Sequence, residues 1–250
     1  MRYFVQFSYH GKRYHGWQIQ PGAITVQEVL QDALGLILKE TVQLTAAGRT
    51  DTGVHARAMF AHFDFFGEFE AESLRDRLNS FLPWDIAVHH ILKVPAEAHA
   101  RFDALERTYE YWVTRSKDPF LGDTAHYVKY PLNMDKMNEA ATKLVGYKDF
   151  ECFSKSKTDV KTFMCDIRTA IWNKEGDKLV FTITADRFLR NMVRAIVGTL
   201  IDIGMGKSAL TDIPLILESR DRSRAGASVP AKGLYLTAIK YPENIMYHNG

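Results

Sequence analysis

Apolar residues in the first hundred positions alternate in some segments and recur at helical spacing in others. Alternation predicts four strands, over residues 3–9, 42–46, 59–65 and 86–94. Helical spacing predicts a helix from Val26 to Leu38, begun by a Thr25–Glu28 capping box, and a second helix over 74–81 that ends before Pro83. With loops over 11–23 and 48–56, the order is β-α-β-β-α-β, the split βαβ unit.

The rest of the chain repeats this order with little residue identity. Strands are predicted over 108–114 and 234–241, and a hairpin over 166–174 and 179–184 turns at Gly176 and Asp177. One helix is capped by Asn133 and ends at Gly146, and two more span 188–203 and 209–217. We therefore expect an α+β protein of two halves, residues 1–100 and 101–250, with the boundary between 98 and 106. A cleft between two such units is a common ligand site.

Composition fits a folded chain in a reducing compartment. The sequence has 250 residues, 46% of them hydrophobic and 25% charged, which excludes a mainly disordered or collagenous state. No stretch approaches the ~18 apolar residues of a membrane helix, and the N-terminus has no signal-peptide core. Because Cys152 and Cys165 are too few for a disulfide framework, we expect a cytoplasmic protein with no membrane partner.

Charge is balanced overall but clustered locally. The net charge is +2, and residues 1–100 carry 9 Lys or Arg against 11 Asp or Glu, whereas residues 101–250 carry 23 against 19. Arginines gather in two short segments: Arg187, Arg190 and Arg194, and Arg220, Arg222 and Arg224. Such clusters in a near-neutral protein favour a groove that binds a polyanion. A solvated charged face is the alternative.

The loop from Gly48 to Gly53 carries the first candidate chemistry. Its glycines permit a tight turn that would present Arg49 and Asp51 side by side. A carboxylate there could act as nucleophile or base, and the arginine could hold a phosphate. An ordinary turn is the alternative, since Asp and Gly are common turn residues. A phosphate loop is excluded because no Gly-Lys-Ser/Thr follows.

Two further segments combine basic and aromatic or apolar residues. Arg107, Tyr109 and Tyr111 would share one face of a strand, either as a platform for stacking bases or as core aromatics. On the helix 188–203, Arg190 and Arg194 are four residues apart and would project together. Among apolar neighbours Arg194 would need an anion, for which Asp51 is the candidate, unless its stem packs on the core and its head is solvated.

Other reactive side chains give weaker signals. The histidines form no His-x3-His pair and the cysteines no Cys-x2-Cys pair, so we expect no metal site. His62 lies within a predicted strand and is interpreted as a hydrogen-bonded, partly buried residue. Cys152, between aromatic residues, is interpreted as a small hydrophobic residue rather than a nucleophile. No Gly-x-Ser-x-Gly signature occurs.

Several short motifs follow one another along the chain: Tyr9-His10-Gly11 with Tyr14, Gly16, Trp17 and Gln18, Thr25–Glu28, Gly48–Ala56, His99–Phe102, Arg107–Tyr109, Met192–Arg194 and Lys232–Leu236. Taken in order, these motifs resemble the tRNA pseudouridine synthase A family along nearly the whole chain. Three positions differ from the family pattern. His10 stands in place of Asp, Thr52 in place of Ala, and Ala98 in place of Phe.

The resemblance implies isomerisation of uridine to pseudouridine at positions 38–40 of the tRNA anticodon arm, without a cofactor. It implies two RRM-like halves that share one mainly antiparallel sheet around a basic cleft, in a homodimer. The roles implied are Asp51 as the catalytic carboxylate, Tyr109 as the stacking partner of uracil, Arg49 as a group that fills the space of the extruded base or holds its phosphate, Arg194 as the partner that keeps Asp51 ionised, and Leu234 as a contact to the base.

Two other functions compete with this interpretation. A non-catalytic RNA-binding protein of two RRM-like units is disfavoured because the RNP1 pattern is absent. A metal-dependent hydrolase that acts on nucleotides would need further carboxylates near Asp51, and the sequence has none there. Whether Asp51 attacks C6 of uracil, attacks C1′ of ribose or only abstracts a proton stays open at this stage.

Overall fold

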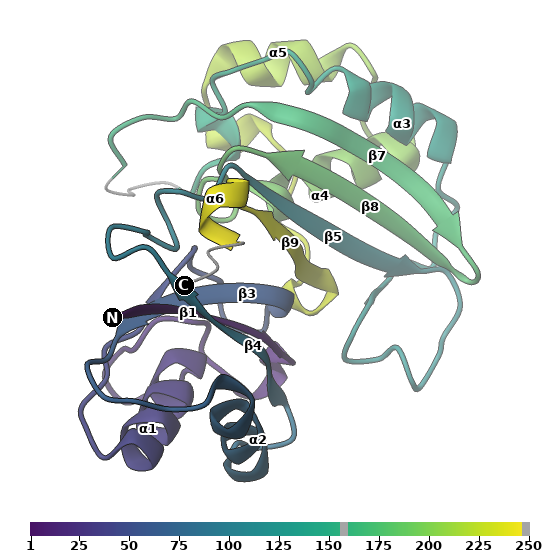
Figure 1. Ribbon diagram of the computed structural model, residues 1–250. Coiled ribbons are helices and arrows are strands. Elements are labelled where there is room, and N and C mark those ends of the chain that lie inside the picture. Colours follow the sequence, from purple (N-terminus) through teal and green to yellow (C-terminus); the bar gives the residue numbers. More distant parts are fainter. Residues whose placement is uncertain (156–159, 247–250) are drawn as a thin grey trace. The chain divides into compact units, whose positions relative to one another are not determined.

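The alternating N-terminal segment forms β1 (Arg2–Tyr9), an inner strand of the first sheet in the computed structural model (Figure 1). The structure describes residues 1–155 and 160–246. β1 pairs antiparallel with β3 (His55–Asp64) on one side and with β4 (Ile86–Val94) on the other. β3 also pairs antiparallel with the short β2 (Thr45–Ala46), and parallel with β9 (Leu234–Lys240). The last strand of the chain therefore joins the first sheet.

Two helices pack on this first sheet through their apolar faces. α1 (Val26–Leu38) begins where the Thr25 hydroxyl accepts a hydrogen bond from the Glu28 amide at 3.4 Å, as the predicted capping box requires. α2 (Ala71–Phe81) begins at Glu70, whose carboxylate accepts from the next helical amides. Figure 1 shows α1 and α2 side by side, and their inward residues are buried: Leu30, Leu34, Leu74 and Leu78.

A second set of strands is built from the middle of the chain. β5 (Glu106–Thr114) pairs antiparallel with β8 (Lys178–Ala185), and β8 pairs antiparallel with β7 (Ile167–Glu175). The short β6 (His126–Tyr127), which the sequence did not predict, adds to β5 in parallel. The β7–β8 hairpin turns at Gly176, so that prediction is confirmed.

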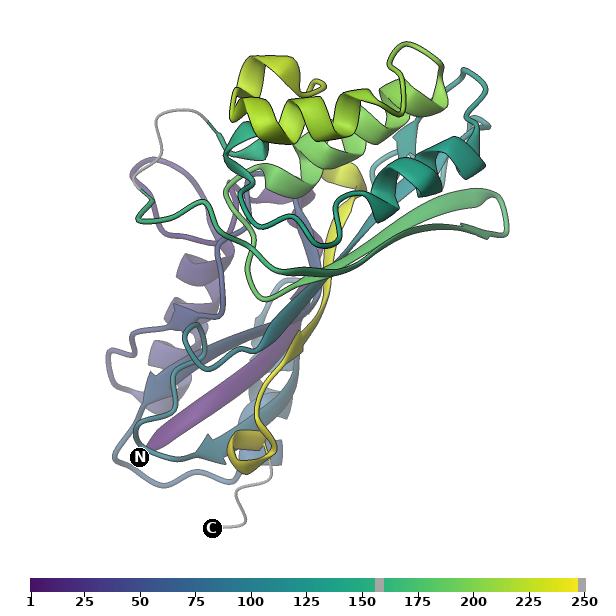
Figure 2. The ribbon, with the colours of Figure 1, turned by 90° about the horizontal axis from the view of Figure 1, so that it is seen from above.

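Three helices accompany these strands. They are α3 (Met134–Thr142), α4 (Met192–Gly204) and α5 (Asp212–Ser219). In Figure 2 the green hairpin of β7 and β8 lies under these helices. Asn133 caps α3 as predicted, by accepting from the Lys136 amide at 3.0 Å. α4 is buried almost all round, so it forms the core of this region. Pro214 is accommodated in the first turn of α5, where its missing N–H costs no helical bond.

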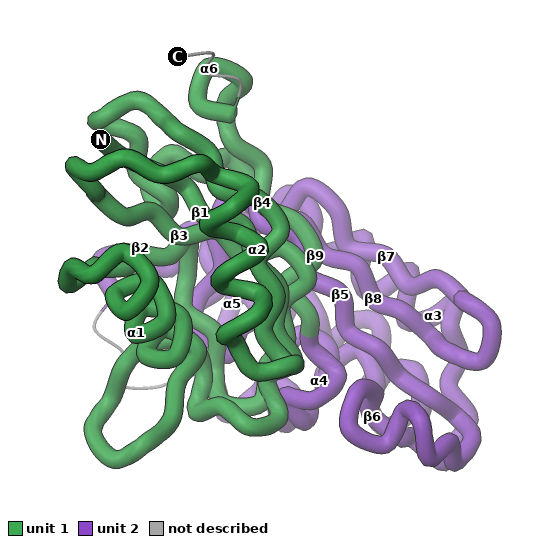
Figure 3. Tube along the Cα trace, turned by 60° about the horizontal axis from the view of Figure 1, so that its bottom comes forward, with its two compact units in different colours: residues 1–106, 235–250 green, residues 107–234 purple. Residues whose placement is uncertain are grey.

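Figure 3 colours the two compact units into which the chain divides. Unit 1 comprises Met1–Glu106 and Tyr235–Gly250, and unit 2 comprises Arg107–Leu234. Within each unit the elements form mixed α+β structure with mostly antiparallel strands, which confirms the predicted class. The predicted division into halves 1–100 and 101–250 stays a prediction. A short helix, α6 (Glu243–Met246), follows β9. Within the described ranges, no helix combines the length and apolarity that crossing a membrane requires.

The prediction that a helix starts at Phe188 is wrong, because α4 begins only at Met192. Asn191 adopts the left-handed conformation (φ 67°), which interrupts helical backbone directly before α4. Arg190 therefore precedes the helix, and the expected projection of Arg190 and Arg194 from one helical face does not occur.

The prediction of a strand over 42–46 is correct only for its last two residues. Val42 and Leu44 are buried, which produced the alternating pattern, but glutamine side chains of α1 take the place of a neighbouring strand. Gln31 accepts from the Leu44 amide at 3.1 Å, and Gln27 donates to the Leu44 carbonyl at 2.9 Å. Residues 42–44 therefore lie outside the sheet, although Val42 and Leu44 are buried.

Candidate active site

Asp51 lies in a tight loop between β2 and β3 in unit 1. The Asp51 carbonyl accepts a hydrogen bond from the Val54 amide at 3.1 Å, and Gly53 takes a left-handed conformation (φ 79°) that closes the turn. Asp51 is half-buried and Arg49 is exposed. The loop between two strands is as the sequence predicted, and it carries Arg49 and Asp51 two residues apart, directly before β3.

The segment after β1 presses against this loop through two glycines. A Cβ on Gly11 would lie 2.0 Å from the Val54 carbonyl oxygen, and one on Gly16 would lie 2.4 Å from that of Thr50. Main-chain bonds reinforce the contact, from the Trp17 amide to the Thr50 carbonyl and from the Gly53 amide to the Tyr14 carbonyl, both at 3.3 Å. Only residues without a side chain permit this approach, so the two glycines fix the backbone beneath Asp51.

Two side chains complete this support. The hydroxyl groups of Tyr9 and Thr50 are hydrogen-bonded at 2.8 Å. The Nδ1 atom of His55 accepts from the Gly11 amide at 3.0 Å, which in the neutral ring places the proton on Nε2. His55 is buried, and its ring stacks on Tyr235 with the centroids 4.6 Å apart. The loop is therefore held on both sides in a defined orientation.

In unit 2, Tyr111 is a core residue, so of the two alternatives predicted for this strand face, stacking platform or core aromatics, the second is correct for Tyr111. Its side chain is fully buried, and its hydroxyl donates to the Pro230 carbonyl at 2.8 Å. A Cβ on Gly233 would lie 2.8 Å from the ring. Burial raises the pKa of Tyr111, and the nearby positive charge of Arg194 opposes that rise. Strand periodicity did not reveal that the segment 230–233 covers this ring.

Tyr109, two residues earlier on β5, has a more open environment. It is half-buried, and its ring meets the edge of Phe188 with centroids 5.1 Å apart and planes at 87°. Arg107 on the same strand donates to the Asp186 carbonyl at 2.8 Å, so its guanidinium group also stabilises the local structure of unit 2. Of the three residues predicted to share a face, Tyr109 keeps the partial exposure that a stacking residue requires.

Arg194 lies in the first turn of α4 and connects that helix to the segment before β9. Its Nε donates to the Val229 carbonyl at 2.7 Å, and the Val229 amide donates to the Arg194 carbonyl at 3.2 Å. Leu234, at the start of β9, is buried. The predicted pairing of Arg194 with Asp51 joins residues of different units and stays a prediction.

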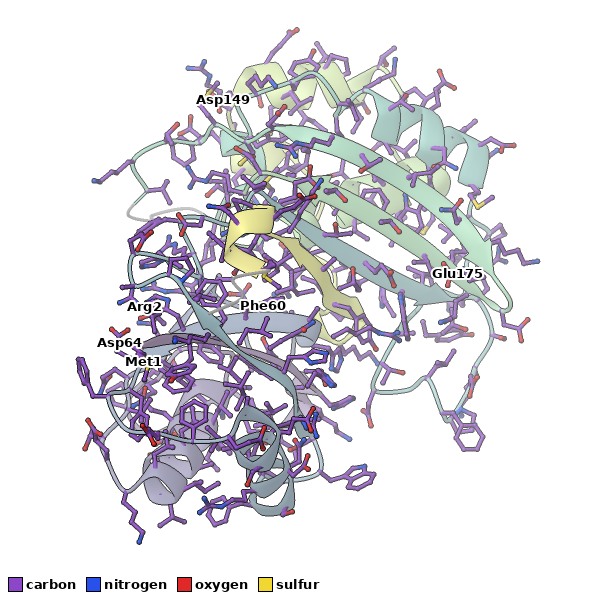
Figure 4. All side chains as sticks on the ribbon, viewed as in Figure 1. Met1, Arg2, Phe60, Asp64, Asp149 and Glu175 are labelled. Carbon is purple, nitrogen blue, oxygen red and sulfur yellow. The ribbon has the colours of Figure 1, made fainter. Side chains whose placement is uncertain are left out.

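The arginines of the second cluster in the sequence, Arg220, Arg222 and Arg224, differ in their contacts. Arg220 pairs with Asp149 at 3.1 Å, and Asp149 is labelled in Figure 4. Arg222 donates to the carbonyls of Ala225 and Gly226 and to the Ser228 hydroxyl, and so holds the loop that lies on α4. Arg224 is exposed. Two of the three arginines therefore have partners within unit 2.

The histidine and cysteine interpretations agree with their surroundings. His62 is buried, and its Nδ1 accepts from the Ala100 amide at 3.2 Å. Burial lowers the pKa of His62 to about 4, helped by the positive charge of Arg2. Burial raises the pKa of both Cys152 and Cys165 to about 12, which makes them poor nucleophiles. Across residues 1–155 and 160–246, no three His, Cys, Asp or Glu side chains are grouped as metal ligands.

Sequence reasoning missed a hollow on unit 1 beside the Asp51 loop. Its volume is about 240 Å³, and its lining includes His10 and His55 together with Arg57, Trp84 and Tyr235. The only sequence signal was an aromatic residue directly after Pro83 at a turn. A larger depression, of about 720 Å³, lies over α1 and α2, but its acidic lining of Glu70, Glu72 and Asp76 would repel a polyanion.

Comparison with known proteins gives a consistent result. The profile of a family described as tRNA pseudouridine synthase matches residues 6–103 and 140–242. Proteins named tRNA pseudouridine synthase A from Bacteroides fragilis and Porphyromonas gingivalis are each 49% identical to this chain over 98% of both sequences. The protein of that name from Bacillus subtilis is 40% identical over 96% of this chain and 99% of its own length.

Proposed function

Because this chain belongs to the tRNA pseudouridine synthase family, we propose that it isomerises uridine to pseudouridine at positions 38–40 of the tRNA anticodon stem-loop. The reaction breaks the bond between N1 of uracil and C1′ of ribose and forms a bond between C5 and C1′. C5 loses a proton and N1 gains one, so atoms and electrons balance within the nucleotide. This chemistry requires a carboxylate and access to an unstacked base.

Asp51 is the catalytic carboxylate in this proposal. It attacks C6 of uracil or C1′ of ribose, or only abstracts a proton. Arg194 keeps Asp51 ionised, since an opposite charge lowers the pKa of a carboxyl group. Arg49 occupies the place of the extruded base or holds its phosphate. Tyr109 stacks on uracil and Leu234 packs against it.

The proposal includes an arrangement of the substrate and the subunits. Two RRM-like halves carry one continuous sheet with helices on one side, and a basic cleft between them receives the anticodon arm. The enzyme acts as a homodimer in the cytoplasm. Phosphate contacts in such a cleft would make tRNA affinity fall steeply with salt.

One observation carries the catalytic assignment. Gly11 and Gly16, from a neighbouring segment, pack against the backbone of the Asp51 loop too closely for any side chain. A nucleophile or base must be held within a fraction of an ångström of its target, and this close main-chain packing supplies such positioning. Support for the substrate comes from family membership over the whole chain.

The test is release of tritium from tRNA that carries uridine labelled at C5. The wild-type protein should release tritium and leave the strand intact, because isomerisation replaces the C5–H bond without cleaving the backbone. A non-catalytic RNA-binding protein would bind the tRNA without release, and a hydrolase would cut the strand. Either of these two results would overturn the proposal.

A further inference from the structure

The hollow beside the Asp51 loop has an aromatic wall. The ring of His55 lies between His10, at 4.3 Å between centroids, and Tyr235, at 4.6 Å. His55 is also the residue that accepts from the Gly11 amide. The wall is therefore rigid, and it shares its central residue with the support of the Asp51 loop.

A tryptophan, Trp84, also lines the hollow. Trp84 is fully exposed, whereas the other three tryptophans, Trp17, Trp112 and Trp172, are 8% exposed or less. An indole contributes a large favourable free energy when it is buried, so Trp84 would gain from contact with a flat apolar group of a ligand.

The turn that carries Trp84 is well anchored. The His10 amide donates to the Asp85 carbonyl at 2.9 Å, and the Ile86 amide donates to the Pro83 carbonyl at the same distance. The Tyr14 hydroxyl donates to the Asp85 carboxylate at 2.5 Å. The exposed indole is thus mounted on fixed backbone, and a partner would meet a preformed surface.

Charge at the hollow favours an anion. The Arg57 guanidinium lies 5.7 Å from the centroid of Tyr235, in cation–π geometry, and Arg57 is exposed. The carboxylate in the lining belongs to Asp85, which is already engaged by Tyr14 and, at 3.3 Å, by Arg13. A ligand here would therefore meet one cation, imidazole rings and a flat apolar surface.

We propose that this hollow is a subsite for one unpaired nucleotide of the RNA substrate, with a base stacked on Trp84 and its phosphate bound by Arg57. Base-stacking aromatics beside an arginine are the usual means of holding single-stranded RNA. The volume of about 240 Å³ is below the ~300–1,000 Å³ of pockets for drug-sized ligands, which suits a single base. The proposal rests on the proposed function, since it names a contact of the same substrate.

Trp84 itself provides the probe. Because it is the exposed tryptophan, quenching of intrinsic fluorescence by acrylamide, a neutral quencher, reports on its accessibility. Saturating tRNA should protect this fluorescence from acrylamide, and the protection should vanish in Trp84→Phe, which removes the signal. Full accessibility of Trp84 in the tRNA complex would overturn the proposal.

Affinity measurements assign the contributions of base and phosphate. Trp84→Ala should raise the Kd for tRNA about tenfold, as expected for one lost base stack, and Trp84→Phe should recover most of it. Arg57→Gln should reduce the slope of log K against log salt by about one, the effect of one phosphate contact. The matched controls are Phe66→Ala, another exposed aromatic residue of unit 1, and Arg77→Gln, an exposed arginine on α2. Equal effects in the controls would also overturn the proposal.

These results separate the subsite from the proposed activity. Protection of Trp84 by tRNA without tritium release would leave the subsite standing and contradict the isomerase proposal. Tritium release with Trp84 accessible, and with an unchanged Kd in Trp84→Ala, would leave the isomerase standing and remove the subsite.

Discussion

Two loops, residues 48–54 in unit 1 and 225–229 in unit 2, are both packed against glycines too closely for a side chain. A Cβ on Gly11 would lie 2.0 Å from the Val54 carbonyl oxygen, and a Cβ on Gly198 would lie 1.8 Å from that of Ala227. The loops differ in what else holds them. Main-chain bonds, Tyr9 and His55 support the first, whereas the charged side chains of Arg194 and Arg222 bind the second.

Asp51 and Arg194 therefore differ in whether the charged side chain also supports the local structure. Asp51 sits on a loop that other residues fix, so its charge can be removed while those contacts remain. Arg194 is itself part of the support of Val229, so its removal changes both charge and structure. A loss of activity therefore has a simpler meaning at Asp51 than at Arg194.

The strongest test of this comparison is Asp51→Asn. The amide keeps the shape of the side chain but cannot act as nucleophile or base, so turnover should fall by about 1,000-fold or more. Thermal melting and tRNA binding should stay close to wild type. Tritium release measured beside calorimetry checks both statements, and substantial residual turnover would reject Asp51 as the catalytic group.

Gly11→Ala should displace the Asp51 loop without touching its chemistry. The new methyl group would collide with the Val54 carbonyl, and a shift of about 1 Å in a reacting group costs about 100-fold in rate. Melting temperature should fall as well. Gly48→Ala is the control for stability, because no atom lies within 4 Å of a Cβ there. Unchanged activity in Gly11→Ala would mean that the loop adjusts freely.

Arg194→Met should lower the free energy of unfolding by about 1–3 kcal/mol, because the Val229 carbonyl loses its donor. If Arg194 also pairs with Asp51, turnover should fall by more than the loss of folded protein explains, because Asp51 then lacks its partner cation. Arg194→Lys should restore only part of the lost stability and turnover, because lysine lacks the planar fork. A stability loss with unchanged turnover of the folded protein would assign the pairing with Asp51 to Arg49 or Arg190.

Substitutions of Tyr109 test whether unit 2 contributes to tRNA binding through an aromatic ring rather than through a charged side chain. Tyr109→Phe should bind tRNA as well as wild type, and should turn over more slowly only if the hydroxyl takes part in proton transfer. Tyr109→Leu should weaken binding by about tenfold through the lost stack. Filter binding and single-turnover rates separate the two effects. A harmless Leu substitution would make Tyr109 a packing partner of Phe188 and nothing more.

His62 makes the stability of unit 1 sensitive to acid. Its folded pKa is about 4 against an ordinary 6.5, so the unfolded chain binds the proton first and stability falls as pH drops from about 6.5 to about 4. The loss should be roughly 1–3 kcal/mol. His62→Gln keeps an acceptor for the Ala100 amide and should reduce this dependence.

The neighbouring His99, whose pKa is also lowered, would leave a smaller slope in the His62→Gln variant. Arg2 and Asp64, labelled in Figure 4, form an ion pair beside this site, and Asp103 is the other nearby carboxylate. As the pH falls, protection of backbone amides from hydrogen exchange should decrease in β3 of unit 1 before it decreases in β8 of unit 2. Equal loosening of both strands would contradict the assignment to His62.

Local patterns sufficed for most elements because their causes are local. Thr25 and Asn133 cap their helices as predicted, and alternation located β1, β4 and the β7–β8 hairpin. The predictions failed where the local conformation depends on contacts that the local sequence pattern does not show. Asn191 in a left-handed conformation delays α4, and glutamines of α1 replace a strand partner of Leu44. Neither effect leaves a periodic signature.

For the candidate site, sequence reasoning located the Asp51 loop because Gly-x-x-Asp-x-Gly is itself a turn pattern. It could not show that Gly11 and Gly16 lie against that loop, since the contact joins segments some forty residues apart. Nor could it distinguish Tyr109 from Tyr111, because both have the same strand parity and only the cover from Pro230 and Gly233 buries one of them.

The parallel pairing of β3 with β9 sets an order on folding during synthesis. Unit 2 is continuous from Arg107 to Leu234, so all its strands have emerged before β9 is made. Unit 1 lacks its last strand until residues 235–240 leave the ribosome, although its first hundred residues are made long before. At 5–20 residues per second this delay lasts roughly 7–30 s, during which the edge of β3 at His55 and Ala56 has no partner strand. The nascent chain must therefore be protected at that edge, which lies at the end of the loop that carries Asp51.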